Sequence, residues 1–160
     1  MRFEKDICII LNQDLLKVMR QCVQNAHPNE SGGLLFGEIF QNAMEEGFRY
    51  DFSCKIFECF VSNEKSPVSY WMNNIETLFS FLKIYNDKYN LKLLSIFHSH
   101  PASSYPSGFD ENYMKYLYNF PQKAFKNAIW TIMDASNYDL NGFFYLEGEI
   151  VQINVMIVEH

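Results

Sequence analysis

The chain has 160 residues, 48% of them hydrophobic, which suits one domain over residues 1–160 with one buried core and excludes wholesale disorder. Its formal net charge is −6, and its lysines and arginines are scattered without a basic cluster. Nucleic-acid binding requires a basic footprint, so we expect no nucleic-acid partner. No segment approaches the ~18–20 apolar residues of a membrane helix, and no signal peptide is apparent. We therefore expect no membrane association and a cytoplasmic location.

Hydrophobic periodicity predicts the elements of the first half of the chain. In chain order they are a strand at 3–10, a helix at 12–26, a strand at 34–40, a turn at 45–47, a strand at 48–61, a loop at 62–72, and a helix from Asn73 or Asn74 to about Tyr89.

The second half begins with a nearly continuous apolar run, Leu91 to Phe97, which is typical of a central strand buried on both faces. The elements after it are a loop at 101–109, a helix from about Asp110 to before Pro121, and strands at 127–133, 140–146 and 149–158. The order β-α-β-β-α-β-α-β-β-β predicts a mixed α/β (α+β) fold. We expect a central, mostly antiparallel sheet flanked by helices.

The four cysteines, Cys8, Cys22, Cys54 and Cys59, lie in apolar segments and form no Cys-x-x-Cys pair. We therefore expect four buried thiols in a reducing compartment and no zinc site built from cysteines. Cys54 and Cys59, five residues apart on one strand, should face opposite sides of the sheet.

Two histidines, His98 and His100, follow the buried apolar run at its C-terminal end. Side chains at i and i+2 of a strand point to the same face, so both imidazoles can grip one metal ion. Asp110 offers a third ligand and leaves a fourth position for water, which is the pattern of a catalytic zinc. Ser107 and Asp110 equally fit a helix capping box, so spacing alone leaves the role of Asp110 open.

The order of these residues resembles the motif of the JAMM metalloproteases, a family also called MPN+ or Mov34/JAB. The motif is an upstream glutamate, then His-x-His-Pro, then Ser-x-x-Asp, and here these are Glu30, His98 to Pro101, and Ser107 to Asp110. The segment from Pro28 to Gly37 resembles the family's first motif, in which an acid precedes a glycine-led apolar strand. The resemblance spans residues 5–158 and implies the cytidine-deaminase-like JAMM/MPN fold of a compact, prokaryotic-type member.

The resemblance also assigns a role to each motif residue. His98, His100 and Asp110 match the ligands of one Zn²⁺ ion, and Glu30 matches the general base that works on the attacking water. Ser107 matches the residue that helps to hold the oxyanion. Without the resemblance, Glu30 would read as an ordinary solvated turn residue. One departure is the loop between His100 and Asp110, which is one residue shorter than in many relatives.

The family mostly cuts after the C-terminal Gly-Gly tail of ubiquitin or a ubiquitin-like protein, so the resemblance implies such a substrate. Ser69, Tyr70 and Trp71 occupy the place of an insertion that lines this tail, and we expect them to contact it. The alternative is that Tyr70 and Trp71 pack under the following helix. A sulfur-carrier protein or small peptide is the alternative substrate, and a metal-binding scaffold subunit without activity is the non-enzymatic alternative. A homodimer or a partner subunit also stays open.

Overall fold

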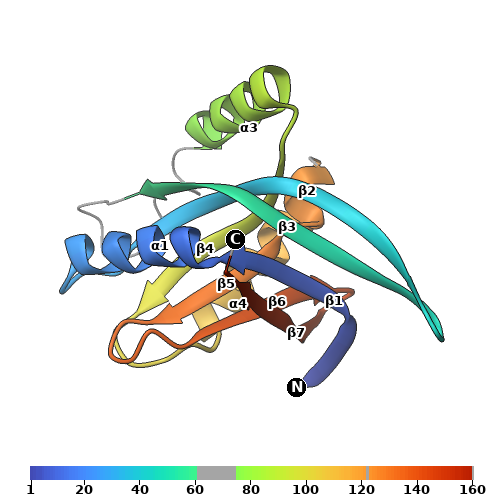
Figure 1. The fold of residues 1–160 in the computed structure, drawn as a ribbon. Helices are drawn as coiled ribbons and strands as arrows, with labels where there is room; N and C mark the ends of the chain where they lie inside the picture. The colour runs from blue at the N-terminus through green and yellow to red at the C-terminus, as the bar shows by residue number, and fades with distance from the viewer. Residues whose placement is uncertain (61–74, 122, 160) are drawn as a thin grey trace.

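The computed structural model describes residues 1–60, 75–121 and 123–159. Its elements, drawn in Figure 1, follow the predicted order with one addition, the short helix α5. In chain order they are β1 (Arg2–Asn12), α1 (Gln13–Ala26), β2 (Gly32–Met44), β3 (Gly47–Phe60), α3 (Ile75–Tyr89), β4 (Lys92–His100), α4 (Gly108–Tyr118), α5 (Lys123–Lys126), β5 (Ile129–Asp134), β6 (Leu140–Leu146) and β7 (Glu149–Val158).

The differences from the predicted boundaries have local causes. Helix α4 begins at Gly108, two residues before the expected Asp110, because Ser107 caps its first turn. Helix α5 spans only four residues, too few to leave a helical period in the sequence. The loop predicted at 62–72 and the cap predicted at Asn73 or Asn74 lie outside the described residues.

The strands form one mixed sheet in the order β1-β3-β2-β4-β5-β6-β7, and β1 also pairs with β7, so that the pairing returns to its first strand. The pairs β2–β3, β2–β4, β5–β6 and β6–β7 are antiparallel. The pairs β1–β3, β1–β7 and β4–β5 are parallel. The predicted mixed, mostly antiparallel sheet is therefore confirmed.

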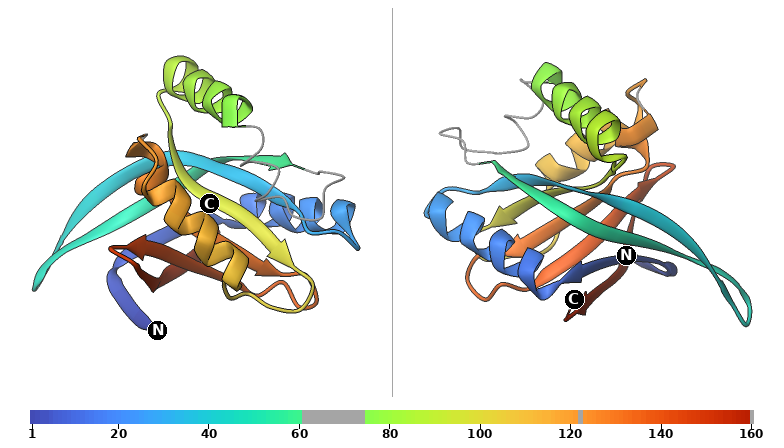
Figure 2. Two further views of the ribbon diagram at one scale, coloured as in Figure 1. Left: turned by 180° about the vertical axis from the view of Figure 1, so that it is seen from behind. Right: turned by 45° about the horizontal axis from the view of Figure 1, so that its top comes forward.

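Helices cover both faces of this sheet (Figure 2). Helix α1 turns Leu16, Met19 and Val23 toward one core cluster, whereas α3, α4 and α5 pack on a second cluster on the other face. Strand β2 shows the alternation directly, because Leu35 belongs to the α1 side and its neighbour Phe36 to the α3 side. No helix among the described residues combines the length and apolar character needed to cross a bilayer.

Strand β4 is the central strand that the apolar run predicts. It lies between β2 and β5, and all of its residues from Leu93 to His100 are buried. Ile96 points to the core cluster that holds α3 and α4. His98 and His100 follow at two-residue steps, so they share this face and point toward the side of the sheet on which α4 lies.

The cysteines correct one expectation. Cys22 of α1 and Cys59 of β3 form a disulfide with a Cα–Cα distance of 5.8 Å, so the prediction of four thiols is wrong for this pair. The packing of α1 against β3 brings the two together over 37 residues, which sequence spacing cannot show. Cys8 and Cys54 are free and buried as predicted. Burial raises the pKa of the Cys54 thiol well above its ordinary range.

Candidate metal centre

The two histidines and the aspartate converge at the C-terminal end of β4. The Nε2 atoms of His98 and His100 lie 3.1 Å apart. Asp110 Oδ1 lies 3.1 Å from His98 Nε2, and Asp110 Oδ2 lies 3.0 Å from His100 Nε2. One ligand atom from each residue falls within 4.8 Å of the others, so the three predicted metal ligands meet at one point.

The donor set fits a divalent metal. Two imidazole nitrogens and a carboxylate are ligands that zinc accepts, and three protein ligands leave a position for water. All three residues are at least nine-tenths buried, so the carboxylate and the two rings face one another away from bulk water. Within the described part of the chain, His98 Nδ1 is buried without a hydrogen-bond partner, and the His98 ring stands nearly perpendicular to the Trp130 ring. A cation bound among these three residues would balance the negative charge of the Asp110 carboxylate, which burial removes from water.

Asp110 caps helix α4 and also places a carboxylate oxygen beside His98, so the cap and a role as metal ligand are compatible. Its Oδ2 accepts the Ser107 N–H at 2.8 Å, and Ser107 Oγ accepts the Asp110 N–H at 3.2 Å, which is a complete capping box. Oδ1 takes no part in the cap and faces His98. The cap therefore fixes the rotamer of Asp110 and leaves one carboxylate oxygen for a metal.

The electrostatics of Asp110 and His100 favour their charged forms in the absence of metal. Burial alone would raise the pKa of Asp110, but hydrogen bonds with His100 and His98 outweigh it and hold this pKa well below its ordinary value. Burial alone would lower the pKa of His100, yet its hydrogen bond and ion pair with Asp110 raise it.

Glu30 lies immediately before β2, beside the histidines. Gly32 pairs with His98, and the Ser99 N–H donates to the Ser31 carbonyl at 3.0 Å, so the antiparallel register brings Glu30 next to His100. Burial raises the pKa of Glu30, while the nearby His100 and His98 favour its charged form. The predicted base therefore belongs to the same cluster as the three predicted ligands, although it lies about seventy residues earlier in the chain.

A serine pair, which the sequence reading did not single out, fixes this arrangement. The hydroxyl of Ser99 accepts the Ser31 N–H at 2.9 Å and lies 3.0 Å from the Ser31 hydroxyl. Both residues are buried. The available signal was the position of Ser99 between two histidines of a strand, which directs its side chain to the opposite face.

The loop from Pro101 to Ser107 is fastened to β6. The amide of Asn141 donates to the Ser104 hydroxyl at 2.8 Å, and Ser104 is buried beneath the exposed loop. This contact holds the loop that leads from His100 to the cap of α4. The loop, shorter by one residue than the family pattern implies, thus still delivers Ser107 and Asp110 to the histidines.

The remaining predicted site residues are placed as follows. Ser107 is exposed at the start of α4, three residues before Asp110 and within its capping box. Ser69, Tyr70 and Trp71, predicted to contact substrate, lie outside the described residues.

Comparison with known families bears on this geometry. The model of a family described as prokaryotic homologs of the JAB domain matches residues 12–144. The chain belongs to this family. The match includes Glu30, both histidines, Ser107 and Asp110, so the whole cluster lies within the JAB domain.

Comparison with solved structures gives likenesses at low sequence identity. The solution structure of protein DSY2949 from Desulfitobacterium hafniense superposes with a TM-score of 0.67 at 20% identity, covering 96% of this chain and 94% of that one. The crystal structure of AF2198, a JAB1/MPN domain protein from Archaeoglobus fulgidus, gives a TM-score of 0.47 at 21% identity, with 92% and 97% covered. Comparison with curated proteins gives no match. At 20% identity, the similarity to DSY2949 shows a common fold and nothing further.

Proposed function

We propose that this JAB domain is a zinc-dependent isopeptidase that cleaves the amide bond at the C-terminal tail of ubiquitin or a ubiquitin-like protein. The observation that carries the proposal is the meeting of His98, His100 and Asp110 at one point with Glu30 beside them. A structural zinc site is usually closed by four protein ligands, whereas the three ligands found here would leave a position open for water. A hydrolytic site needs a carboxylate such as Glu30 as a base.

Each residue then has a chemical task. His98, His100 and Asp110 would hold the metal. Zinc, when bound, supplies an activated water, with its pKa brought toward ~7, and polarises the substrate carbonyl. Glu30 accepts a proton from the attacking water and passes it to the leaving amine.

Ser107 is suited to hold the oxyanion. Its Oγ accepts the Asp110 N–H, so the hydroxyl proton remains free to be donated. Its exposure at the start of α4 leaves it accessible to a substrate carbonyl. A hydrogen bond of this kind strengthens as charge develops on the oxygen, which is how it would favour the transition state.

The substrate class follows from the family resemblance and from chain flexibility. A glycine-rich tail can extend without side-chain clashes, so it can reach a buried metal through a narrow approach. Ser69, Tyr70 and Trp71 are proposed to contact this tail. A sulfur-carrier protein has a comparable tail and is the competing substrate.

The decisive experiment pairs metal analysis with cleavage. The full chain, purified without a metal-affinity tag, is analysed for zinc and offered two fusions side by side, one with a ubiquitin-like tail and one with a sulfur-carrier tail. Glu30→Gln should keep the zinc and lower the cleavage rate by on the order of 10²–10⁴-fold. The matched control is Glu38→Gln, which removes an exposed carboxylate of β2 outside the cluster and should leave both unchanged.

The outcomes separate the alternatives. Cleavage of the sulfur-carrier fusion alone would replace the proposed substrate but keep the chemistry. A chain that binds no zinc, and that shows no cleavage sensitive to Glu30→Gln, would be a scaffold and would refute the proposal.

A further inference from the structure

The β2–β3 hairpin projects from the sheet as an arm, defined here as residues 38–50 (Figures 1 and 2), and β1 pairs with its β3 strand only from Tyr50 onward. Strand β2 pairs with β4 only as far as Gly37, which lies opposite Lys92. From residue 38 to residue 44 it pairs only with β3 among the described residues. The arm therefore presents a free sheet edge, with unpaired backbone N–H and C=O groups along seven residues.

This edge has few of the usual protections against pairing. Natural edge strands carry charged residues, above all lysine, or proline or bulges that prevent another strand from adding to them. Residues 38–44 contain no lysine and no proline, their one charged residue is Glu38, and the register irregularities of β2 lie before them, between Leu35 and Gly37. The arm also exposes large hydrophobic side chains, namely Ile39, Phe40, Met44, Phe48 and Tyr50.

The arm is nevertheless an ordered element. Arg49 donates to the Asp51 carboxylate at 2.7 and 3.0 Å, and the Asn42 side chain on the facing strand donates to the same carboxylate. This polar cluster ties the two strands together on one face. From Asn42 to Arg49 the arm has two strands only. A two-stranded ribbon is marginally stable, so burying its edge and its apolar side chains would be favourable.

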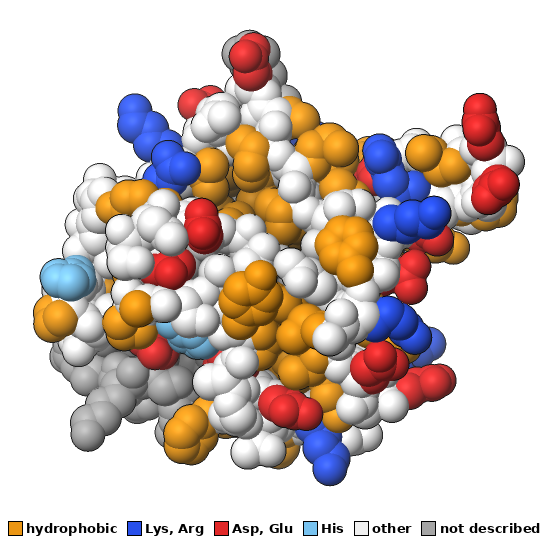
Figure 3. Space-filling view, turned by 90° about the horizontal axis from the view of Figure 1, so that it is seen from below, with side chains coloured by type: hydrophobic (Ala, Val, Ile, Leu, Met, Phe, Trp, Pro, Cys, Tyr) orange, Lys and Arg blue, Asp and Glu red, His pale blue; other side chains and the backbone are white. Residues whose placement is uncertain are grey.

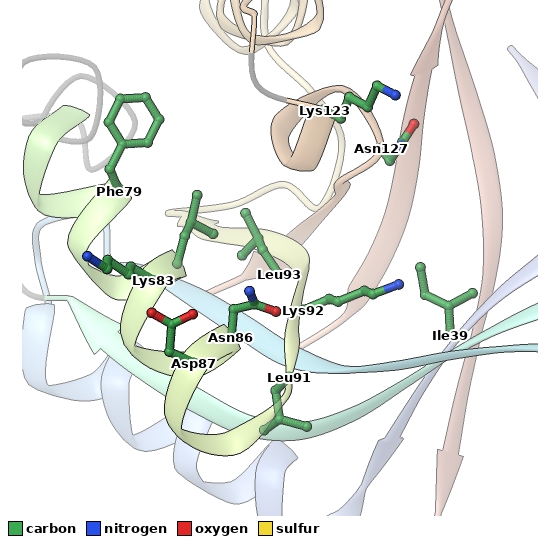
Figure 4. Close-up of a pocket in the computed structure, with 11 residues that line it drawn as sticks. Ile39, Phe79, Lys83, Asn86, Asp87, Leu91, Lys92, Leu93, Lys123 and Asn127 are labelled. Carbon is green, nitrogen blue, oxygen red and sulfur yellow. The ribbon is translucent and has the colours of Figure 1, made fainter.

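The charges at the tip and base of the arm indicate which partner could pair with its free edge. The arm ends in Glu45 and Glu46, both exposed, and Figure 3 shows acidic side chains at the end of the arm. At the base of the arm, where β4 begins, three lysines, Lys83, Lys92 and Lys123, and one acidic residue, Asp87, line a pocket of about 580 Å³ (Figure 4). Within the described part of the chain, none of these three lysines forms an ion pair.

We propose that two copies of this chain associate through their arms, edge to edge, about a twofold axis near Gln41. Antiparallel pairing of residues 38–44 with the same residues of a second copy would continue the sheet from one copy into the other. In that register the acidic turn of each arm arrives in line with the start of β4 of the other copy, beside Lys92. The tip of each arm is acidic and its base carries lysines, so a twofold dimer would form this tip-to-base charge contact twice.

The interface is independent of the metal centre. Lys92 lies at the first residue of β4, and His100 at the last, eight residues further along the strand. The dimer would therefore leave both metal centres open to substrate.

The first experiment is sedimentation of the full chain over a range of concentrations and salt. A reversible dimer that weakens with salt is expected, because exposed charge pairs are screened. Glu45→Lys with Glu46→Lys should raise the dissociation constant on the order of tenfold. Adding Lys92→Glu to this pair should restore much of the association. The matched control, Glu147→Lys with Glu159→Lys, makes the same charge change at two exposed residues away from the arm and should have no effect.

A second experiment does not depend on how charge variants fold. Gln41→Cys, near the proposed axis, should form a covalent dimer under mild oxidation, whereas Val18→Cys on the exposed side of α1 should not. A chain that stays monomeric at every concentration overturns the proposal. So does a dimer that is insensitive to the arm charges and gives no cross-link at Gln41→Cys.

Discussion

The Ser31 N–H donates to the Ser99 hydroxyl at 2.9 Å, and the Ser99 N–H donates in return to the Ser31 carbonyl at 3.0 Å. Ser31 follows Glu30, and Ser99 separates His98 from His100. These two bonds therefore join the segment that carries the proposed base to the strand that carries two proposed ligands. The Ser99 hydroxyl adds a side-chain tie where β2 would otherwise rely on backbone pairing alone.

Ser99→Ala should lower activity more than it lowers metal binding. The substitution leaves the buried Ser31 N–H without its acceptor, at a cost of roughly 1–3 kcal/mol of stability. It also loosens Glu30 relative to the histidines, so kcat should fall while zinc content is kept. The matched control is Ser95→Ala, which removes another buried hydroxyl of β4, four residues before Ser99 and bonded to Thr131 at 2.9 Å. An equal loss of kcat in both variants would show that only stability is involved.

Much of the site could be predicted because its signals are local. His98 and His100 follow a buried apolar run, and the period of a strand alone places them on one face. Asp110 and Ser107 belong to one helix start, and their spacing is short enough to read directly. Only the position of Glu30 beside His100 required long-range register, and there the family motif supplied what periodicity could not.

The features that were missed depend on tertiary packing. The Cys22–Cys59 bridge forms because α1 crosses β3, and nothing in the spacing of the cysteines indicates that crossing. The arm was predicted only in part, since the strand expected at 34–40 continues to Met44. Gln41 and Asn42 interrupt the apolar pattern, and cross-strand bonds such as that from Asn42 to Asp51 hold the extension.

The two functions of Asp110 should be separable. Ser107→Ala removes the acceptor for the Asp110 N–H and should cost about 1 kcal/mol of stability, as cap losses do, with zinc retained. Asp110→Asn should have the opposite result, because its amide oxygen can still accept the Ser107 N–H while the charged ligand is lost. Thermal unfolding and metal analysis of both variants test this. Loss of zinc from Ser107→Ala would mean that the cap itself is required to orient the ligand.

Reduction of the Cys22–Cys59 disulfide should destabilise the fold without removing the site. The bridge closes a span of 37 residues, for which loop-closure entropy gives roughly 4 kcal/mol. The double variant Cys22→Ser with Cys59→Ser should show this loss of stability in denaturant unfolding. The unsubstituted chain should lose the same stability once a reductant is added. The buried free thiols Cys8 and Cys54 provide the control, since Cys54→Ser should leave the response to reductant unchanged. A chain with four titratable thiols under oxidising conditions would contradict the bridge.

Gly37 should be intolerant of any side chain. It is the last residue of β2 that pairs with β4, and a Cβ there would lie 2.0 Å from the Ser53 carbonyl oxygen and 2.8 Å from the Leu94 side chain. Because the first of these atoms is backbone, Gly37→Ala must shift β3 and should cost 1–3 kcal/mol or more, on the order of 2–4 °C in Tm per kcal/mol. The arm begins at this residue, so its polar cluster should also loosen.

The matched control for that substitution is Gly108→Ala, where a Cβ meets no atom within 4 Å. Gly108 opens helix α4, so alanine should leave Tm unchanged or raise it slightly, because alanine loses less backbone entropy than glycine in a helix. Differential scanning calorimetry of the two variants measures the contrast. If Gly37→Ala unfolds at the same temperature as Gly108→Ala, then β2 and β3 are further apart at the base of the arm than their pairing requires.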